Sequence, residues 1–367
     1  MKRILFMIPT LSHGGAERVL TNLVNRLDKS KYDITVKTLF DSGVYREMLN
    51  KDVKYKYVFS SSFKGNTYYF RLFSPQKLFK KYVDTKYDIV ISYLEGPTAR
   101  IIGGCDSTVK VCWIHSDLTD DELFSRSFRN MKEAVDIYGG YDKLIAVSET
   151  VKNSMKLRLP NSDISVLYNT VDSAEILRLS SQLPDDITFD SSVPMVCSVG
   201  RLREVKGFDR LIRVHKRLLN EGIYHKVYIF GEGDEKSNLN ELIKEQSVSN
   251  TFILAGHKEN PFKYVSRCDL FVCSSRREGF STAVTEALIL GTSVVSTDCS
   301  GAYELLGEHD EYGIVTENSE DGLYCGMKRM LTDKRTLDYY KEKARERGNR
   351  FSTEKTVKAV EDMLDNL

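Results

Sequence analysis

The chain has 367 residues, more than one ordinary hydrophobic core accommodates, so its length predicts two domains. It is 41% apolar and 29% charged, and no apolar run approaches the roughly 18 residues that span a bilayer, which argues against an integral membrane protein. Seven cysteines without a CxxC pair argue against a disulfide framework and a zinc site, and favour reduced thiols in the cytoplasm.

The net charge of +1 hides an asymmetry between the two halves of the sequence. Residues 1–170 hold 26 Lys/Arg against 19 Asp/Glu, whereas residues 171–367 hold 27 against 33. Residues 51–82 contain eight cations, ten aromatic side chains and a single acidic residue, Asp52. This composition suits peripheral contact with an anionic membrane or a phosphate-bearing acceptor, and the alternative is a solvated region whose aromatic residues face the core. No nucleic-acid-binding motif accompanies the charge.

The first half of the chain alternates strand-like and helix-like segments. Residues 3–9 form an apolar run too short for a comfortable signal-peptide core, which we interpret as a first buried strand. Residues 18–27 carry a helical apolar stripe, formed by Val19, Leu20, Leu23, Val24 and Leu27. Further strands are expected at 32–40, 87–94, 109–115 and 142–148. Strands that alternate with helices predict a parallel α/β sheet.

The pattern restarts after a polar, proline-bearing segment at 173–194, which we interpret as a linker. A second helical stripe lies at 208–219, and strands are expected at 195–200, 226–233, 251–256, 269–275 and 293–297. The predicted organisation is two doubly wound domains, 1–172 and 195–349, and a C-terminal helix at 350–367 that can cap either domain. Because ligands bind at the carboxyl ends of such strands, the cleft between two such sheets is the predicted site.

Two loops that follow the first strand of each half have the composition of anion sites. Gly14 and Gly15 stand before a helix, where backbone N–H groups and the helix dipole favour a phosphate; an ordinary strand–helix turn is the alternative. In the corresponding loop of the second half, Arg201 and Lys206 together offset a diphosphate, unless they are merely solvated. The GEGDE sequence at 231–235 lacks the third glycine of a dinucleotide fingerprint, and its carboxylates repel a pyrophosphate, so we interpret it as a tight turn.

The stretch 277–291 places a carboxylate on each side of a helix start. Ser281 or Thr282 can cap this helix, and Gly291 ends it. Glu286 lies in an apolar second turn, where a charge needs a partner such as the paired hydroxyl groups of a ribose, unless the side chain faces solvent.

With Glu278, Glu286 forms an E-x7-E motif, which occurs here together with HGGAE near the N-terminus and GRLREVKG at 200–207. In these features, over nearly its whole length, the chain resembles the retaining, nucleotide-sugar-dependent glycosyltransferases of family four, which have the two-domain GT-B fold. The resemblance implies a hexosyltransferase that moves a sugar from a nucleotide-diphosphate sugar donor to a saccharide or lipid-linked oligosaccharide acceptor. It further implies surface polysaccharide biosynthesis in the cytoplasm, at the inner face of the cell membrane if residues 51–82 contact lipid.

The resemblance also implies a role for each residue at a matching position. As catalytic residues, Arg201 and Lys206 neutralise the diphosphate leaving group, Glu278 binds hydroxyl groups of the transferred sugar, and His115 faces that sugar near the reaction centre. The implied donor-binding residues are Gly14, Gly15, Arg201, Lys206, Gly256, His257, Lys258, Glu278, Gly279, Phe280, Ser281, Thr282 and Glu286. Within this set Gly15 faces the diphosphate, residues 256–258 hold the base, and Glu286 takes the ribose.

The resemblance implies no metal cofactor, and the sequence contains no Asp-x-Asp motif. It implies front-face attack with retention of configuration, and no enzymatic nucleophile is assigned. Two alternatives stay open. A sugar-nucleotide epimerase on the same fold would need an acid/base set, and none of the six histidines pairs obviously with a carboxylate in the sequence. A catalytically inactive relative is disfavoured because Arg201, Lys206, Glu278 and Glu286 are all present.

Overall fold

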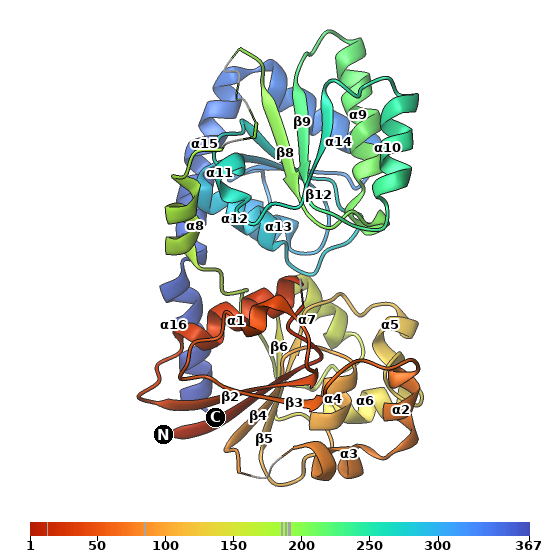
Figure 1. The fold of residues 1–367 in the computed structure, drawn as a ribbon, viewed down its shortest axis with the longest axis vertical. Helices are drawn as coiled ribbons and strands as arrows, with labels where there is room; N and C mark the ends of the chain where they lie inside the picture. Colours follow the sequence, from red (N-terminus) through yellow and green to blue (C-terminus); the bar gives the residue numbers. More distant parts are fainter. Residues whose placement is uncertain (13, 84–85, 185, 188, 190–191) are drawn as a thin grey trace. The chain divides into compact units, whose positions relative to one another are not determined.

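The structure is a computed structural model of the chain and describes all residues except 13, 84–85, 185, 188 and 190–191. The chain divides into two compact units: unit 1 comprises Met1–Val171 and Glu354–Leu367, and unit 2 comprises Asp172–Thr353. Each unit is built on one sheet in which every pairing is parallel, with helices on both faces (Figure 1). The predicted pair of doubly wound α/β sheets is confirmed.

Sheet 1, in unit 1, has seven strands in the order β3-β2-β1-β4-β5-β6-β7. Their bounds are β1 (Lys2–Ile8), β2 (Tyr32–Phe40), β3 (Lys54–Phe59), β4 (Ile89–Ser92), β5 (Val109–Ile114), β6 (Lys143–Ala146) and β7 (Ile164–Val166). In the register, Met7 of β1 pairs with Ser92 of β4, and Ser92 pairs with Cys112 of β5. The loops that follow β1, β4 and β5 therefore emerge side by side at the carboxyl edge of sheet 1.

The helices of unit 1 include α1 on one face of sheet 1 and α3, α4 and α6 on the opposite face (Figure 1). Their bounds are α1 (Gly15–Arg26), η1 (Val44–Arg46), α2 (Asn66–Leu72), α3 (Pro75–Tyr82), α4 (Pro97–Ile102), α5 (Asp121–Ser125), α6 (Met131–Gly139) and α7 (Glu149–Lys156). The apolar stripe predicted for α1 is confirmed, since its five members are buried. The C-terminal helix α16 (Thr353–Asp365) meets the first helix–strand connection, where Glu361 accepts the backbone N–H of Asp28 and Asp365 accepts the hydroxyl of Tyr32.

Sheet 2, in unit 2, has six strands in the order β10-β9-β8-β11-β12-β13. Their bounds are β8 (Met195–Val199), β9 (Lys226–Phe230), β10 (Phe252–Gly256), β11 (Leu270–Cys273), β12 (Ser293–Thr297) and β13 (Ile314–Thr316). The helices are α8 (Ser173–Ser180), η2 (Glu204–Lys206), α9 (Phe208–Asn220), α10 (Lys236–Glu245), α11 (Phe262–Val265), α12 (Thr282–Leu290), α13 (Ala302–Leu306), α14 (Glu320–Thr332), α15 (Lys334–Gly348) and η3 (Asn349–Phe351).

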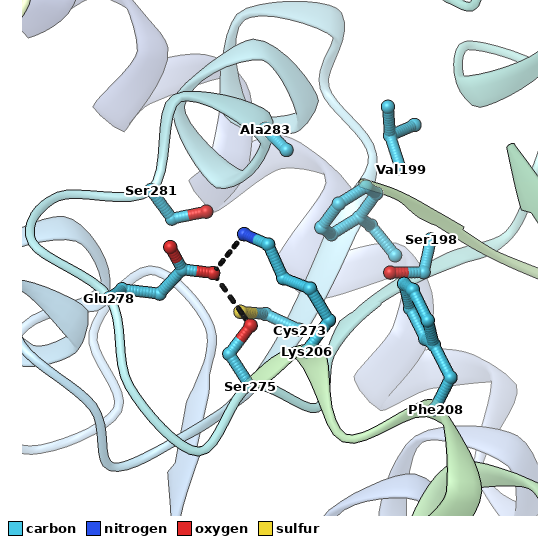
Figure 2. A pocket seen from close by; sticks show the side chains of 10 residues that line it. Ser198, Val199, Lys206, Phe208, Cys273, Ser275, Glu278, Ser281 and Ala283 are labelled. Carbon is cyan, nitrogen blue, oxygen red and sulfur yellow. Dashed lines mark hydrogen bonds and ion pairs between the residues drawn. The ribbon is translucent and has the colours of Figure 1, made fainter. Parts of the chain in front are cut away.

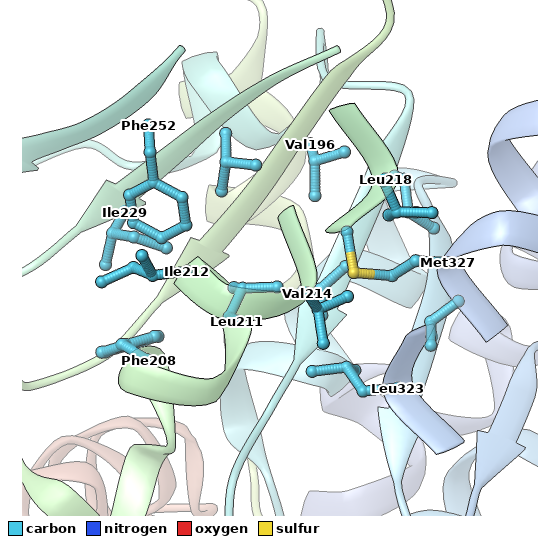
Figure 3. Packing of buried hydrophobic residues seen from close by; sticks show 14 of the residues in the cluster. Val196, Phe208, Leu211, Ile212, Val214, Leu218, Ile229, Phe252, Leu323 and Met327 are labelled. Carbon is cyan, nitrogen blue, oxygen red and sulfur yellow. The ribbon is translucent and has the colours of Figure 1, made fainter. Parts of the chain in front are cut away.

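A continuous apolar core joins one face of sheet 2 to helices α9 and α14. Figure 3 shows Leu211, Val214 and Leu218 of α9 against Leu323 and Met327 of α14, in one cluster with side chains from the strands of sheet 2. All of these side chains are at most 2% exposed. This core fixes the start of α9, and with it the loop that carries Lys206.

The segment 173–194, interpreted as a linker, begins with the helix α8, and the structure groups it with unit 2. Asn260 donates from its side chain to the carbonyl of Leu179, and Arg267 donates to the carbonyl of Ser180, so hydrogen bonds tie α8 to the α11 region. The sequence also left three strands unpredicted, namely β3, β7 and β13. All three strands lie at the edge of a sheet, and β7 and β13 are also only three residues long. Their apolar signal in the sequence is therefore weak.

No helix in the described part of the chain is both long enough and apolar enough to cross a membrane.

Candidate functional site

Three neighbouring loops at the carboxyl edge of sheet 2 are tied together by their backbones. The loop after β8 meets the loop after β9, because Leu202 N–H donates to the carbonyl of Glu232 at 2.9 Å. The loop after β9 meets the end of β10 through Gly231 N–H and the carbonyl of Gly256, also at 2.9 Å. The GEGDE turn is thus hydrogen-bonded to two loops that carry predicted site residues.

Gly207 brings the loop that carries Lys206 against the loop after β11. Its φ of +65° is left-handed, and a Cβ at this position would lie 2.1 Å from the carbonyl oxygen of Ser274. Arg210 donates to the same carbonyl from two nitrogens, at 3.1 and 2.7 Å. The hydroxyl of Ser274 in turn donates to the carbonyl of Lys206 at 2.9 Å. Only a glycine permits this close approach, so the backbone of Lys206 is held in place by local contacts.

Lys206 and Glu278 meet directly in this site. Lys206 Nζ lies 2.6 Å from Glu278 Oε1, and the hydroxyl of Ser275 donates to the same oxygen at 2.6 Å (Figure 2). The ammonium and carboxylate side chains are 26% and 13% exposed, so the pair is largely withdrawn from water. Within the residues that the structure describes, Glu278 Oε2 has no hydrogen-bond partner, which leaves one carboxylate oxygen available to a ligand.

The electrostatics of the site favour the charged form of Lys206. Burial disfavours the Lys206 ammonium, but the neighbouring Glu278 carboxylate outweighs burial and raises the pKa of Lys206 above its usual value. The pair lines a small pocket of about 10 Å³ together with Ser275, Ser281 and Cys273. This volume holds about one water molecule, so the two side chains fill most of the space between them.

The helix that follows Glu278 starts and ends as predicted. Ser281 is the N-cap of α12 and accepts the backbone N–H of Val284, and Gly291 terminates the helix with a left-handed φ of +72°. Thr282 is the first helical residue. Glu286 is 7% exposed in the second turn, so the structure contradicts the alternative in which it faces solvent.

The remaining predicted residues of unit 2 are spread along the same edge. Gly279 and Phe280 stand between Glu278 and the helix start, and Phe280 packs on Phe351 with ring centroids 5.8 Å apart. Arg201 is exposed and does not line the pocket that holds Lys206, so the structure does not bring the two cations into one pocket.

The base-binding loop predicted at 256–258 lies at the end of β10. Gly256 has a left-handed φ of +74°, and His257 is exposed. Lys258 forms an ion pair with Asp186 and lies over the ring of Tyr264, with its Nζ 5.6 Å from the ring centroid. The Lys258 ammonium therefore has local partners. The backbone of the loop is not helical, and Gly256 adopts the left-handed conformation that glycine favours.

The glycines predicted to precede a helix in unit 1 stand at the start of α1. Gly14 is the N-cap of α1, and Gly15 is its first residue. The carboxylate of Glu17 folds back over this start, since a Cβ on Gly14 would lie 1.8 Å from Glu17 Oε2. An anion at this helix start therefore requires the Glu17 side chain to move away.

His115 lies directly after β5, next to the loop that follows β4. Its backbone N–H donates to Glu95 Oε2 at 2.9 Å, and its ring lies 5.1 Å from that of Tyr93. Burial lowers the pKa of His115 to about 3, against a hydrogen bond to the backbone of Tyr93, so the ring is neutral at physiological pH. Its Nε2 is buried and has no hydrogen-bond partner among the described residues.

Sequence reasoning missed Ser275, Cys273 and Glu95. Ser275 and Cys273 follow from the strand β11 reaching the carboxyl edge three to five residues before Glu278, a signal that the sequence contains. Glu95 follows β4 in a LEGP turn, and its proximity to His115 depends on β4 pairing with β5, which no local pattern specifies. Among the described residues, no cluster of three or more His, Cys, Asp or Glu side chains has the arrangement of a metal site.

Two units, each built on a doubly wound parallel sheet, form the architecture of the GT-B fold. The solved structure of Anabaena HepE, crystallised with UDP and glucose, superposes with a TM-score of 0.80 over 100% of both chains at 19% identity. Sucrose-phosphate synthase from Thermosynechococcus elongatus superposes with a TM-score of 0.78 over 100% of this chain and 99% of that chain, at 14% identity. These likenesses establish the fold.

Sequence comparison identifies the family. Residues 13–175 match the model described as Glycosyltransferase Family 4, and residues 181–347 match Glycosyl transferases group 1. The chain belongs to the family-four glycosyltransferases of the GT-B fold.

Two curated relatives illustrate the family. The N-acetylgalactosamine-N,N'-diacetylbacillosaminyl-diphospho-undecaprenol 4-alpha-N-acetylgalactosaminyltransferase of Campylobacter jejuni is 35% identical over 234 residues, which cover 62% of this chain. The match spans only 61% of that enzyme's own length. The amylovoran biosynthesis glycosyltransferase AmsD of Erwinia amylovora is 24% identical over 100% of both chains.

Proposed function

We infer that the protein is a retaining hexosyltransferase. It transfers a sugar from a nucleotide-diphosphate sugar to a saccharide or lipid-linked oligosaccharide acceptor during the synthesis of a surface polysaccharide. The relatives support the acceptor class, since the C. jejuni enzyme is named for a diphospho-undecaprenol acceptor and the E. amylovora protein for amylovoran biosynthesis. The solved neighbour with bound UDP supports a nucleoside diphosphate donor.

The observation that carries the proposal is the contact between Lys206 and Glu278. A half-buried ammonium beside a carboxylate with one free oxygen offers a cation for the leaving diphosphate and an acceptor for a sugar hydroxyl within one site. Donor binding would replace part of the ion pair with substrate contacts. Ser281 and the first N–H groups of α12 lie beside the pair and suit phosphate or sugar oxygens. Glu286 takes the ribose in this proposal, and Arg201 adds a second cation.

The proposed reaction exchanges two bonds at the anomeric carbon of the donor. The bond to the diphosphate oxygen breaks while the acceptor hydroxyl oxygen bonds on the same face, and the hydroxyl proton passes to an oxygen of the departing diphosphate. Lys206 stabilises the charge that develops on that diphosphate. No metal takes part in the proposal, so EDTA should leave the rate unchanged.

A panel of nucleotide sugars tests the proposal. The wild-type chain is incubated with UDP-, GDP- and ADP-linked hexoses and lipid-linked saccharides, and nucleoside diphosphate release is measured with and without acceptor. Acceptor-dependent release with an α-linked product from an α-linked donor, read by NMR, supports retaining transfer. An inverted product would contradict retention, and isomerised nucleotide sugar without release would favour an epimerase.

The second part of the proposal is peripheral membrane contact by residues 51–82. Tyr68 and Leu72 of α2 are 71% and 72% exposed, and Lys77, Lys80 and Lys81 lie on the exposed side of α3. Several other aromatic residues of the region pack on one another, as in the contacts of Phe59 with Phe63, Tyr69, Phe70 and Tyr82. Exposed apolar and basic side chains on one segment suit an anionic lipid surface at the inner face of the cell membrane.

Flotation with liposomes that contain phosphatidylglycerol tests this contact. Replacing Lys77, Lys80 and Lys81 by Gln should weaken binding roughly 100-fold, because each lysine near an anionic surface contributes about 1 kcal/mol. The control replaces three exposed lysines of unit 2, namely Lys236, Lys244 and Lys334. Equal loss in both triple variants, or no salt-sensitive binding by the wild type, would refute the membrane contact.

A further inference from the structure

The loop after β4 places a carboxylate beside the buried histidine of unit 1. Glu95 Oε2 accepts the backbone N–H of His115 at 2.9 Å, and Glu95 Oε1 has no partner among the described residues. The loop itself is fixed: the side chains of Ser92 and Thr98 both donate to the carbonyl of Leu94, and Gly96 adopts a φ of +99°. Glu95 is therefore a positioned side chain rather than a mobile surface carboxylate.

The contact with the His115 backbone does not by itself explain why a carboxylate, rather than a neutral side chain, occupies position 95. The surroundings behind Glu95 are buried. The backbone N–H of the next residue, Gly96, donates to the hydroxyl of Tyr138 at 3.3 Å, and Tyr138 is only 1% exposed. A neutral amide would accept the His115 N–H equally well without the cost of placing a charge against such a surface. The free oxygen of Glu95 and the unpartnered Nε2 of His115 are both hydrogen-bond acceptors.

Two acceptors on neighbouring strands favour a ligand that donates two hydrogen bonds. Because β4 pairs with β5, Glu95 and His115 stand side by side at the carboxyl edge of sheet 1. On the other side of β4, the loop after β1 carries Gly14 and Gly15. A carboxylate repels a diphosphate but binds hydroxyl groups strongly, since hydrogen bonds to charged groups exceed those between neutral groups. The chemistry that matches is a pair of sugar hydroxyls.

We propose that Glu95 is a substrate-binding residue that, with His115 Nε2, holds hydroxyl groups of a sugar at the carboxyl edge of sheet 1. The inference rests on the proposed function and adds a residue to it. The sugar is that of the donor or that of the acceptor, and the experiment separates these sources.

The only tryptophan of the chain reports on this site without turnover. Trp113 packs on Tyr93 with ring centroids 4.9 Å apart, and Tyr93 contacts His115. Its emission is titrated in the wild type and in Glu95→Gln, first with UDP-N-acetylgalactosamine and with UDP, then with N-acetylgalactosamine in the presence of UDP. The Gln side chain retains an oxygen for the His115 N–H. Glu95→Asp, which keeps the charge and shortens the reach, repeats the test if the amide does not fold.

The matched control is Asp88→Asn. Asp88 precedes β4 at the opposite edge of the sheet and likewise accepts a backbone N–H from the neighbouring strand, that of Arg3 at 2.8 Å. Glu95→Gln should weaken sugar-dependent binding by roughly 10-fold or more in one arm, donor or acceptor, and leave UDP affinity unchanged. Asp88→Asn should change neither arm. Wild-type affinities in both arms of Glu95→Gln would overturn the inference, whereas binding without transfer would refute the proposed function alone.

Discussion

The carboxyl edges of the two sheets differ in how completely their polar side chains are satisfied. At sheet 2, the Lys206 ammonium, the Ser275 hydroxyl and one oxygen of Glu278 form a closed set of contacts. At sheet 1, His115 Nε2 is buried without a partner in the described part of the chain. The contrast teaches that a candidate site is recognised in two ways, by charges that compensate each other and by acceptors that lack a donor.

The largest effect should come from breaking the closed set at sheet 2. Lys206→Ala removes the cation that faces the leaving diphosphate, so we expect turnover to fall roughly 10²-fold or more. Lys236→Ala is the control, since Lys236 forms an exposed ion pair with Glu232 near the same edge. Steady-state rates with the active nucleotide sugar measure both. Equal rates in Lys206→Ala and the wild type would show that this contact does not serve the reaction.

The close approach of two loops at sheet 2 can be tested through glycine. Gly207→Ala combines a left-handed φ with a Cβ at 2.1 Å from a carbonyl oxygen, so it should lower the free energy of unfolding by about 3 kcal/mol. Gly222→Ala shares the left-handed φ, at +78°, but has no atom within 4 Å of its Cβ, and should cost only about 1 kcal/mol. Urea denaturation compares the two. Equal losses would mean that the loops are not held together as described.

Buried histidines also differ between the two units. His115 of unit 1 has a buried ring nitrogen without a partner among the described residues, whereas in unit 2 both ring nitrogens of His215 and of His225 have partners. His215 Nδ1 lies 2.9 Å from His225 Nε2, while His215 Nε2 meets Thr251 Oγ1 and His225 Nδ1 meets the carbonyl of Ile223, both at 2.9 Å. The carbonyl only accepts, so His225 Nδ1 carries the proton. His225 Nε2 then accepts from His215, and His215 Nε2 accepts from Thr251. With this assignment, all of these contacts are made while both rings are neutral.

Acid should therefore destabilise the fold. Burial lowers the pKa of His215 to about 3, whereas the unfolded chain titrates near 6.5, so below that pH the unfolded state binds more protons. The free energy of unfolding should fall as pH drops from 6.5 towards 3, by roughly 2 kcal/mol at pH 5 from His215 alone. Denaturation curves at pH 7.5 and 5 measure this loss. His215→Gln is less stable at neutral pH but should lose less on acidification, and an unchanged pH dependence would refute the assignment.

The smallest effect concerns the ribose. Glu286→Ala should weaken nucleoside diphosphate binding about 10-fold, the loss of a hydrogen bond to a charged group, with little change in turnover at saturating donor. Isothermal titration with the nucleoside diphosphate measures the affinity. Because Glu286 is buried, the midpoint of thermal unfolding is recorded in parallel, and Glu286→Gln serves as the control of similar volume. Parent-like affinity would remove its ribose role.

The periodicity of the sequence predicted the central strands of both sheets and the buried faces of α1 and α9, because buried parallel strands are continuous apolar runs. It missed the edge strand β3, whose lysines are exposed, and the three-residue strands β7 and β13. The sequence around Glu278 was enough to predict the N-cap of α12. Contacts such as Lys206 with Glu278 or Glu95 with His115 depend on which strands pair. Strand pairing is decided by residues far apart in the sequence, so no local pattern predicts these contacts.

The central claim is that unit 2 binds a nucleotide sugar through Lys206 and Glu278. The most direct measurement is acceptor-dependent release of nucleoside diphosphate by the wild type, Lys206→Ala and Glu278→Gln, each with the donor that the panel identifies. Release by the wild type that falls roughly 10²-fold or more in both variants, with unchanged unfolding midpoints, is the predicted result. Release at the parent rate by either folded variant would contradict the claim.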